Sequence, residues 1–518
     1  MDIKNILRSS FLQLFLVYSI LVLAISFDKT KSQYFNFLLF SLVLGLIGVF
    51  SLEKKEEPTK ISKALIIIPI ILSIMFRVIP YINNPIPLGY DPGIYKYVFE
   101  IYQKSLPVIP EQNLEGWVKP SISQGLPSLA SIFYSLGLST QQLMMPMLIF
   151  FSSTTILAVY LATKEYFNEQ AAVLSAFIFS ISLAQLSTFT LFYYQNILAI
   201  TSLLFFIYSL KKQNIFLTTL FAASTAFIHR PTFLILALIW GMQTLADRKN
   251  FKRSLIPIFL TFLLTIAIYL PRFEVAVLDV LMPSVASPGT GTFMDIEDYR
   301  LFSLSYFPLS ILGAAYLLKN KQFSPIIYWF IINASIVLFK LIFFHRFIIQ
   351  LDIAMIILAS FAMHSIMARM GKAKFLILSF LFLGGIIVCF TEAINSKPLI
   401  NEENLHSIEM IQYFTPDNAY IVSLNSYYSP WILGYSNRTT IAPGLFSHDI
   451  WTEDEWEFFW KAEKFDEVKA MADMLPKPLY FYVGNHNSLI FMSREKFEDE
   501  CFRKVFEDNG NYLLEYLC

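Results

Sequence analysis

A single carboxylate, Asp91, stands between a long apolar stretch and an aromatic-rich amphipathic one, in the segment from Pro87 to Tyr95. Because Pro92 follows it, Asp91 has an ordinary structural interpretation as the N-cap of a helix. The helix predicted over residues 94–104 carries apolar and tyrosine side chains on one face, which is typical of a helix lying along a membrane interface. A carboxylate held at that surface and partly shielded from water could take a proton from an attacking hydroxyl. We therefore treat Asp91 as a candidate catalytic base.

Positive charge occurs where the surrounding sequence is apolar. Lys340 lies within the apolar run 336–344, and an ammonium inside a membrane span costs roughly 2.5–3.5 kcal/mol on insertion scales. His345 and Arg346 follow closely. Together the three groups supply the charge and the forked N–H donors that bind a phosphate. The alternative is that Lys340 snorkels to the interface beside an ordinary flanking arginine.

Three further candidates for phosphate or donor binding lie near the ends of predicted spans. His229 and Arg230 occupy a tight turn between two short spans, where they either face solvent or line a cavity that enters the bilayer from outside. Arg77 lies near the outer end of its span and is either a snorkelling cation or a partner for Asp91.

Three carboxylates, Asp295, Glu297 and Asp298, are candidate metal ligands, because carboxylate oxygens suit magnesium or manganese. More often such a triplet is an ordinary soluble loop. The sequence has no glycine-rich phosphate loop after a strand, no paired-cysteine metal pattern and no nucleophile elbow, which disfavours nucleotide-driven chemistry. No cofactor is firmly indicated.

Aromatic side chains are candidates for acceptor binding, because their faces stack on sugar rings. Tyr90 and Tyr95 lie close to Asp91, and Trp431 belongs to an aromatic-rich stretch of the C-terminal region. Core packing is the commoner use of such side chains.

The composition indicates a polytopic membrane protein, since 56% of the residues are hydrophobic and 15% are charged. Apolar runs long enough to cross a hydrocarbon core of about 30 Å predict about thirteen spans, at residues 11–27, 34–51, 63–82, 142–163, 169–187, 192–210, 214–229, 231–246, 254–271, 301–318, 325–344, 347–367 and 373–393. The expected fold class is an all-α polytopic membrane bundle with a small C-terminal exterior α/β domain.

The distribution of Lys and Arg orients these spans, because such residues gather in cytoplasmic loops. A cytoplasmic N-terminus with two short spans in residues 214–246 keeps most of them on one side. One long helix kinked at Pro231 would invert the later loops. The favoured topology, in the plasma membrane, places the C-terminal domain and the loops around Asp91, His229 and His345 on the outer face. Convergence of polar groups from separate segments is what a site requires.

The chain divides near Ser396, where the long apolar runs end. We expect two N-terminal spans in residues 1–62, a main bundle in 63–395 with external loops 83–141 and 272–300, and an exterior domain in 396–518. Strands are predicted at residues 420–424, 439–442, 479–483, 488–492 and 512–516, with a helix over 453–472. Because Cys389 lies inside a span, at most one disulfide can form in the exterior domain.

This arrangement resembles the GT-C superfamily of membrane glycosyltransferases, in which an acidic residue occupies the first external loop and a second long external loop follows the seventh span. With residues 63–82 as the first core span, Asp91 lies in the first loop and residues 272–300 form the second. The resemblance, closest to prokaryotic members with exported C-terminal domains, implies a polyprenyl-phosphate-linked sugar as donor. It implies Asp91 as catalytic base, with Lys340, His345 and Arg346 holding the lipid phosphate.

The Trp-Trp-Asp-Tyr-Gly motif of oligosaccharyltransferases is not found in the sequence, so the expected acceptor is a lipid, glycan or protein hydroxyl rather than asparagine. Two other classes of function stay open. A transporter or flippase of lipid-linked sugars would also need intramembrane cations and an outward cavity. In the third interpretation the bundle is a noncatalytic anchor for the exterior domain. The neutral net charge gives no indication of nucleic-acid binding.

Overall fold

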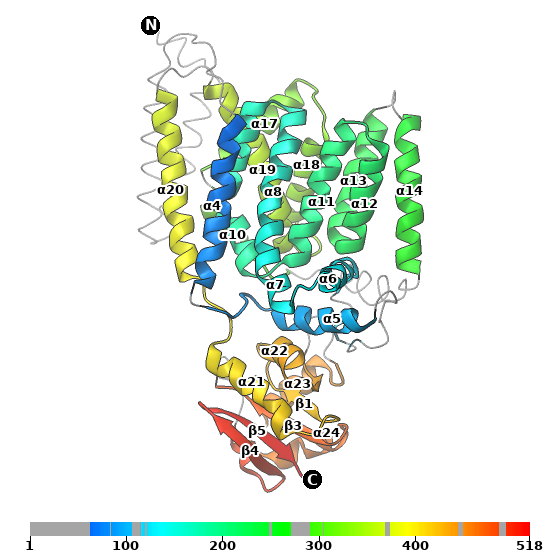
Figure 1. Ribbon diagram of the computed structural model, residues 1–518, viewed down its shortest axis with the longest axis vertical. Helices are drawn as coiled ribbons and strands as arrows, with labels where there is room; N and C mark the ends of the chain where they lie inside the picture. The colour runs from blue at the N-terminus through cyan, green and yellow to red at the C-terminus, as the bar shows by residue number, and fades with distance from the viewer. Residues whose placement is uncertain are drawn as a thin grey trace.

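The computed structural model of the chain describes residues 63–82, 84–105, 114, 117–119, 122–247, 251–270, 291–303, 305–367, 373–443, 449–485 and 494–518. The spans predicted at 11–27 and 34–51, most of the predicted loop 272–300 and the strand predicted at 488–492 lie outside the described residues. Helices stand side by side in an upright bundle, and a smaller domain containing the sheet lies below it (Figure 1).

The bundle consists of apolar helices whose bounds agree with most of the predicted spans to within a few residues. Short polar side chains that accept a backbone N–H set several of the starts, among them Asn168, Asn214 and Ser324. Residues 214–246 form two helices, as predicted, because the extended backbone of His229 interrupts the helix between them. The bundle helices are α4 (Ile67–Val78), α8 (Pro146–Tyr166), α9 (Glu169–Ser180), α10 (Leu183–Thr190), α11 (Tyr194–Lys211), α12 (Ile215–Ile228), α13 (Arg230–Ala246), α14 (Phe251–Tyr269), α17 (Phe307–Lys319), α18 (Pro325–Leu338), α19 (Phe344–Met367) and α20 (Ala373–Asn395).

The predicted count of about thirteen spans is too high for the described part of the chain. Three helical stretches there are long and apolar enough to cross a membrane, Ala64–Tyr81, Thr140–Tyr166 and Phe344–Met367, and counting each of two bent helix pairs as one span gives up to five. Among the described residues, four further apolar stretches are shorter than a full crossing, namely Ile215–Ile228, Arg253–Ile266, Pro325–Leu338 and Phe382–Asn395. The hydropathy pattern does not reveal local breaks in a helix. Ser182 accepts a hydrogen bond from the Gln185 N–H and starts α10, which lies at 51° to α9 although one continuous span was predicted there.

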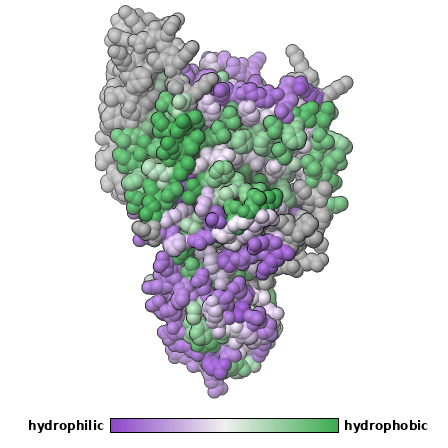
Figure 2. All heavy atoms as spheres, in the orientation of Figure 1, coloured by the Kyte–Doolittle hydropathy of each residue, from purple (hydrophilic) through white to green (hydrophobic). Residues whose placement is uncertain are grey.

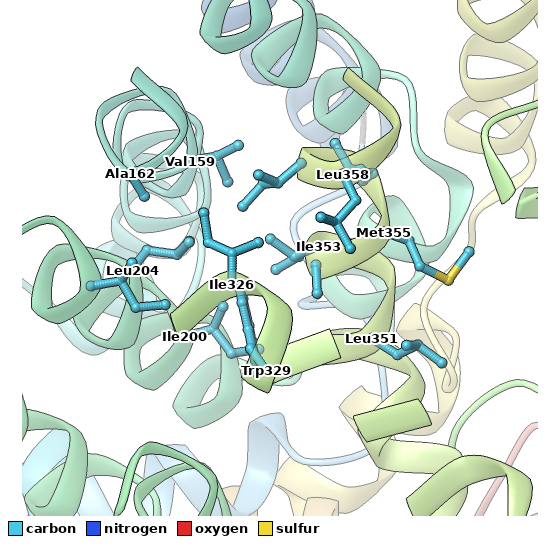
Figure 3. Packing of buried hydrophobic residues seen from close by; sticks show 14 of the residues in the cluster. Val159, Ala162, Ile200, Leu204, Ile326, Trp329, Leu351, Ile353, Met355 and Leu358 are labelled. Atoms are coloured by element: carbon cyan, nitrogen blue, oxygen red, sulfur yellow. The ribbon is translucent and has the colours of Figure 1, made fainter. Parts of the chain in front are cut away.

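Apolar side chains fill the centre of the bundle (Figure 3). Val159 and Ala162 of α8, Leu204 of α11 and Ile326 of α18 belong to one buried cluster with much of α19. On the face that Figure 2 shows, the middle of the bundle is largely apolar, while the two ends of the bundle and much of the C-terminal domain are polar. An apolar belt between polar ends is what a bilayer requires.

The C-terminal domain is α/β, as predicted. Its sheet has the order β2-β1-β3-β5-β4, with parallel pairing of β2, β1 and β3 and antiparallel pairing of β3, β5 and β4. Four predicted strands are confirmed, β4 was not predicted, and the predicted helix 453–472 is divided into shorter pieces. Cys501 and Cys518 form a disulfide. The elements are α21 (Glu402–Phe414), β1 (Tyr420–Ser423), α22 (Ser429–Tyr435), β2 (Thr439–Ile441), α23 (Glu453–Lys461), α24 (Lys469–Asp473), β3 (Leu479–Val483), β4 (Phe502–Asp508) and β5 (Asn511–Tyr516).

Helix α5 (Pro92–Ser105) joins the domain to the bundle (Figure 1). Its apolar face, including Ile94 and Val98, is buried in a cluster with residues of the bundle. On the other side of α5, helix α22 crosses it with the two backbones in contact. A Cβ added to Gly93 would lie 1.8 Å from the Pro430 carbonyl oxygen. Lys96 Nζ donates to the Gly434 carbonyl at 2.7 Å. The predicted interfacial helix is therefore covered by protein on both faces.

Candidate functional site

Asp91 lies in the turn before α5, at the level where the bundle meets the C-terminal domain. Gly89 has φ 82°, and a Cβ added there would lie 2.7 Å from the Leu191 carbonyl carbon, so the turn rests on the connection between α10 and α11. On the other side, Tyr90 OH donates to the Ser426 carbonyl at 2.6 Å. Asp91 is half-buried between these contacts. Burial raises the pKa of its carboxyl to about 6, and the positive charge of Arg346 opposes that shift.

Arg346, in the first turn of α19, is the cation that the structure associates with Asp91. Its Nη2 donates to Thr292 Oγ1 at 3.1 Å, and its Cζ lies 5.6 Å from the centre of the Tyr193 ring. Tyr193 OH donates to the same Thr292 hydroxyl at 3.2 Å. Gly291 has φ 77°, and a Cβ there would lie 3.2 Å from Arg346 Cγ, so the short segment before α16 (Ile296–Ser303) packs on this arginine. The segments that carry Tyr193 and Thr292 thus meet at the Arg346 guanidinium, whose charge acts on Asp91.

His229 faces the same charge but is not itself a cation. Burial and the charges of Arg346 and Arg230 lower its pKa to about 3, so the ring is neutral at neutral pH. Its Nδ1 accepts the Thr232 N–H at 3.3 Å, which leaves the proton on Nε2. As a candidate for phosphate or donor binding, His229 would therefore act as a neutral hydrogen-bond donor. Arg230 begins α13 beside it.

A hydrogen-bonded chain fixes this histidine to the bundle. The Thr232 hydroxyl lies 2.9 Å from His229 Nδ1 and 3.2 Å from Gln350 Nε2, and Trp329 Nε1 donates to Gln350 Oε1 at 3.1 Å. Helices α13, α18 and α19 are therefore linked at the level of the site.

Arg77 has a structural position and is not a partner of Asp91. It is buried, with Nε 2.5 Å from Ser152 Oγ and Nη1 2.6 Å from Ser73 Oγ. Its Cζ lies 5.5 Å from the centre of the Phe189 ring. The predicted role in donor binding is corrected, because these contacts occupy the guanidinium inside the bundle.

Two of the predicted acceptor contacts are also packing residues. Tyr95 is buried among aromatic rings, with its ring centre 5.7 Å from that of Phe192. Trp431 is fully buried and stacks on Tyr435 at 5.6 Å. Neither has a face open to an acceptor. Tyr90, half-buried beside Asp91, keeps the predicted position.

Lys340 and His345 lie on either side of the turn between α18 and α19. Lys340 is exposed and has φ 50°. His345 Nε2 lies 3.7 Å from Asp295 Oδ1. Both therefore belong to the end of the bundle that carries Arg346.

The predicted metal site does not assemble from the residues that the structure describes, where no three His, Cys, Asp or Glu side chains come together as a ligand group. Asp295 and Glu297 are exposed. These carboxylates do not fit the ligand set that a divalent cation needs, and we derive no reaction step through a metal.

Asp352, in the middle of α19, was missed by the sequence analysis. Its fully buried carboxylate accepts hydrogen bonds from Ser182 Oγ at 2.9 Å, Gln185 Nε2 at 2.8 Å and the hydroxyls of Tyr299 and Tyr306. It therefore ties α10, α16 and α17 to α19 and holds the segment that carries Thr292. An acidic residue inside an apolar run is the signal that identifies it.

The chain has the fold of the GT-C membrane glycosyltransferases. The Archaeoglobus fulgidus oligosaccharyltransferase, solved with Zn and sulfate, matches with a TM-score of 0.60 and 15% identity over 85% of this chain and 71% of that one. ArnT from Cupriavidus metallidurans, solved with undecaprenyl phosphate, matches with a TM-score of 0.56 and 11% identity over 87% of this chain and 97% of that one. The arabinofuranosyltransferase AftD from Mycobacteria matches with a TM-score of 0.50 and 11% identity over 89% of this chain and 42% of that one.

At these identities the likeness is one of fold. No protein-family model and no curated protein sequence matches the chain.

Proposed function

We propose that the chain is a membrane glycosyltransferase that moves a sugar from a polyprenyl-phosphate-linked donor to an acceptor hydroxyl, with inversion at the anomeric carbon. The observation that carries the proposal is the position of Asp91: a half-buried carboxylate with a pKa of about 6 that lies in the field of the Arg346 guanidinium, which Thr292 holds. The shared fold includes solved complexes with undecaprenyl phosphate and with dolichol-phosphate, which supports a lipid phosphate as leaving group.

Asp91 acts as the general base in this reaction. The acceptor O–H proton passes to the carboxylate while the acceptor oxygen forms a bond to the anomeric carbon. The bond from that carbon to the phosphate oxygen breaks, and its electron pair leaves with the lipid phosphate. A carboxylate with a pKa of about 6 is ionised at neutral pH, yet it is a stronger base than an exposed aspartate.

Arg346 stabilises the negative charge that develops on the departing phosphate. Thr292 and Tyr193 hold its guanidinium in place, so little reorganisation is needed during the reaction. Lys340 and His345 add charge and donors from the same end of the bundle, and the neutral His229 donates through Nε2. Tyr90 donates a hydrogen bond to the Ser426 carbonyl, so the turn at Asp91 lies against the C-terminal domain. In this proposal the acceptor binds beside that contact.

The site faces the outer side of the membrane in this proposal, with a cytoplasmic N-terminus. Lys- and Arg-rich connections at the opposite end of the bundle favour this orientation. The Cys501–Cys518 disulfide supports it, because disulfides persist in oxidising compartments. The shorter apolar helices are also embedded, since they expose side chains such as Phe216 and Phe259.

The test is a transfer assay with the purified full chain and a panel of polyprenyl-phosphate hexoses and pentoses, with release of free polyprenyl phosphate as the readout. The wild type should release lipid phosphate only when acceptor is present. Asp91→Asn should lower release at least a hundredfold while donor binding and unfolding temperature stay near those of the wild type. Activity of Asp91→Asn above a tenth of the wild type would show that Asp91 is not the base. Transport of the lipid-linked sugar without cleavage would show that the protein is a transporter and not an enzyme.

A further inference from the structure

A cavity lies at the opposite end of the bundle from Asp91, and we call it the distal pocket. It has a volume of about 580 Å³ and lies between the C-terminal ends of α8, α11, α13 and α17 and the N-terminal ends of α12, α14 and α18. Helix α13 starts at Arg230 beside the site and ends at the distal pocket 17 residues later, a distance of about 26 Å at 1.5 Å per residue. A molecule bound there cannot take part in chemistry at Asp91. The volume is in the range of small-molecule sites, roughly 300–1,000 Å³.

Two cations line the distal pocket with donor capacity left over. Arg253 Nη1 donates to Gln213 Oε1 at 2.6 Å, and Nη2 reaches the Gln213 carbonyl at 3.4 Å. These contacts use two of the five guanidinium N–H donors. Lys211 Nζ lies 5.3 Å from the centre of the Tyr166 ring and has no carboxylate partner among the described residues, whereas its neighbour Lys212 is paired with Glu165 at 2.7 Å. The two cations suit the oxygens of a phosphate.

The same pocket also presents acceptors. Gln243 Oε1 is buried without a hydrogen-bond partner among the described residues, and Asp247 lines the pocket on the same helix turn. A buried oxygen without a donor is costly. Gln243 Oε1 needs a donor, so the fitting ligand carries a hydroxyl or ammonium group next to its phosphate.

The surroundings of the pocket favour a lipid as the source of that headgroup. Ile215, Pro257 and Leu317 form apolar parts of the wall. Phe216 and Ile256, next to lining residues, are 72% and 51% exposed on the outer sides of α12 and α14. Acyl chains can follow this apolar surface while the head enters the pocket.

We propose that the distal pocket binds the headgroup of a glycerophospholipid, with Lys211 and Arg253 holding the phosphate and Gln243 accepting a hydrogen bond from the hydroxyl or ammonium beside it. The ligand stabilises the bundle end and is not a substrate. Phosphatidylethanolamine fits these three side chains, because its ammonium supplies the N–H donor for Gln243 Oε1. Phosphatidylcholine has the same charge but no N–H donor.

The experiment measures unfolding temperature of the delipidated full chain in detergent with added short-chain phosphatidylethanolamine or phosphatidylcholine. Phosphatidylethanolamine should raise the unfolding temperature by roughly 2–4 °C and phosphatidylcholine by less than half as much. Lys211→Ala and Arg253→Ala should remove most of the shift, and Gln243→Leu should make the two lipids equal. Lys212→Ala is the matched control, since this lysine is adjacent but outside the lining, and it should keep the full shift.

Three results would overturn the proposal. The first is an unchanged shift in Lys211→Ala and Arg253→Ala, both of which alter exposed side chains. The second is equal shifts from the two lipids in the wild type. The third is a full shift from soluble phosphoethanolamine at the same concentration, which would assign the pocket to a water-soluble phosphate ester.

Discussion

The environment of Asp91 sets the pH dependence expected of transfer. Because the base acts only when ionised and burial raises its pKa to about 6, kcat/KM should be level above about pH 7 and fall about tenfold per pH unit below 6. With an exposed aspartate as the base, the fall in kcat/KM would begin near pH 4. A rate profile from pH 5 to pH 8.5, recorded under conditions where the protein stays folded, measures the difference. A flat profile down to pH 5 would contradict the role of Asp91.

Arg346 should not be replaceable by lysine. A lysine keeps the charge but loses the fork that donates to Thr292 and the planar face that lies on Tyr193. Arg346→Lys should therefore lower kcat by about 10²–10³, the range seen when one preorganised donor is removed. Arg300→Lys, an exposed arginine in the adjoining α16, is the control and should retain wild-type activity. A loss smaller than threefold in Arg346→Lys would mean that charge alone is sufficient.

At the scale of elements, Asp352 anchors the helices that support the site. Asp352→Ala removes an acceptor shared by four donors, and each unpaired buried donor costs roughly 1–3 kcal/mol. We expect the free energy of unfolding in detergent to fall by at least about 3 kcal/mol, with loss of transfer because α16 is released. Ser360→Ala is the control on the same helix: among the described residues the Ser360 hydroxyl bonds only to the Ile356 carbonyl, so its removal should change stability little. Similar stability for both variants would show that the Asp352 network is not an anchor.

The sequence allowed most elements to be predicted, because apolar runs and their polar ends define helices directly. It did not show that α9 and α10 are bent apart, since hydropathy averages over the cap at Ser182. Asp91 and Arg346 could be proposed as site residues from the sequence, because charge stands out in an apolar chain. Trp431 was misassigned, because composition cannot distinguish a buried aromatic ring from one that binds a ligand.

For the whole molecule, the proposed orientation predicts the state of the cysteines. Only Cys389 is free among the three cysteines, and it is buried, while Cys501 and Cys518 are bonded. Protein purified from membranes, then denatured without reductant, should react with one maleimide per chain, and with three after reduction. Three reactive thiols before reduction would argue that the C-terminal domain lies on the reducing, cytoplasmic side.

The close crossing of α5 and α22 brings the C-terminal domain against the helix that follows Asp91, so in the proposed function this domain supports the site. A Cβ at Gly434 would lie 2.2 Å from the Gly93 carbonyl oxygen, two residues from Asp91, so the backbones must separate to admit one methyl group. Gly434→Ala should weaken the docking by about 1–3 kcal/mol, the usual cost of overpacking. Hydrogen exchange in α5 should then rise, and kcat should fall as the turn at Asp91 loses its support.

Gly241→Ala gives the matched comparison, because a Cβ on this glycine of α13 meets nothing within 4 Å. Alanine is favoured over glycine in a helix by up to about 1 kcal/mol, so this variant should be at least as stable as the wild type and fully active. If Gly434→Ala also keeps wild-type exchange in α5 and wild-type kcat, the domain does not position Asp91. If Gly434→Ala loses activity while hydrogen exchange in α5 stays unchanged, Gly434 instead affects acceptor binding. A rise in the KM for the acceptor without a change in kcat would identify that case.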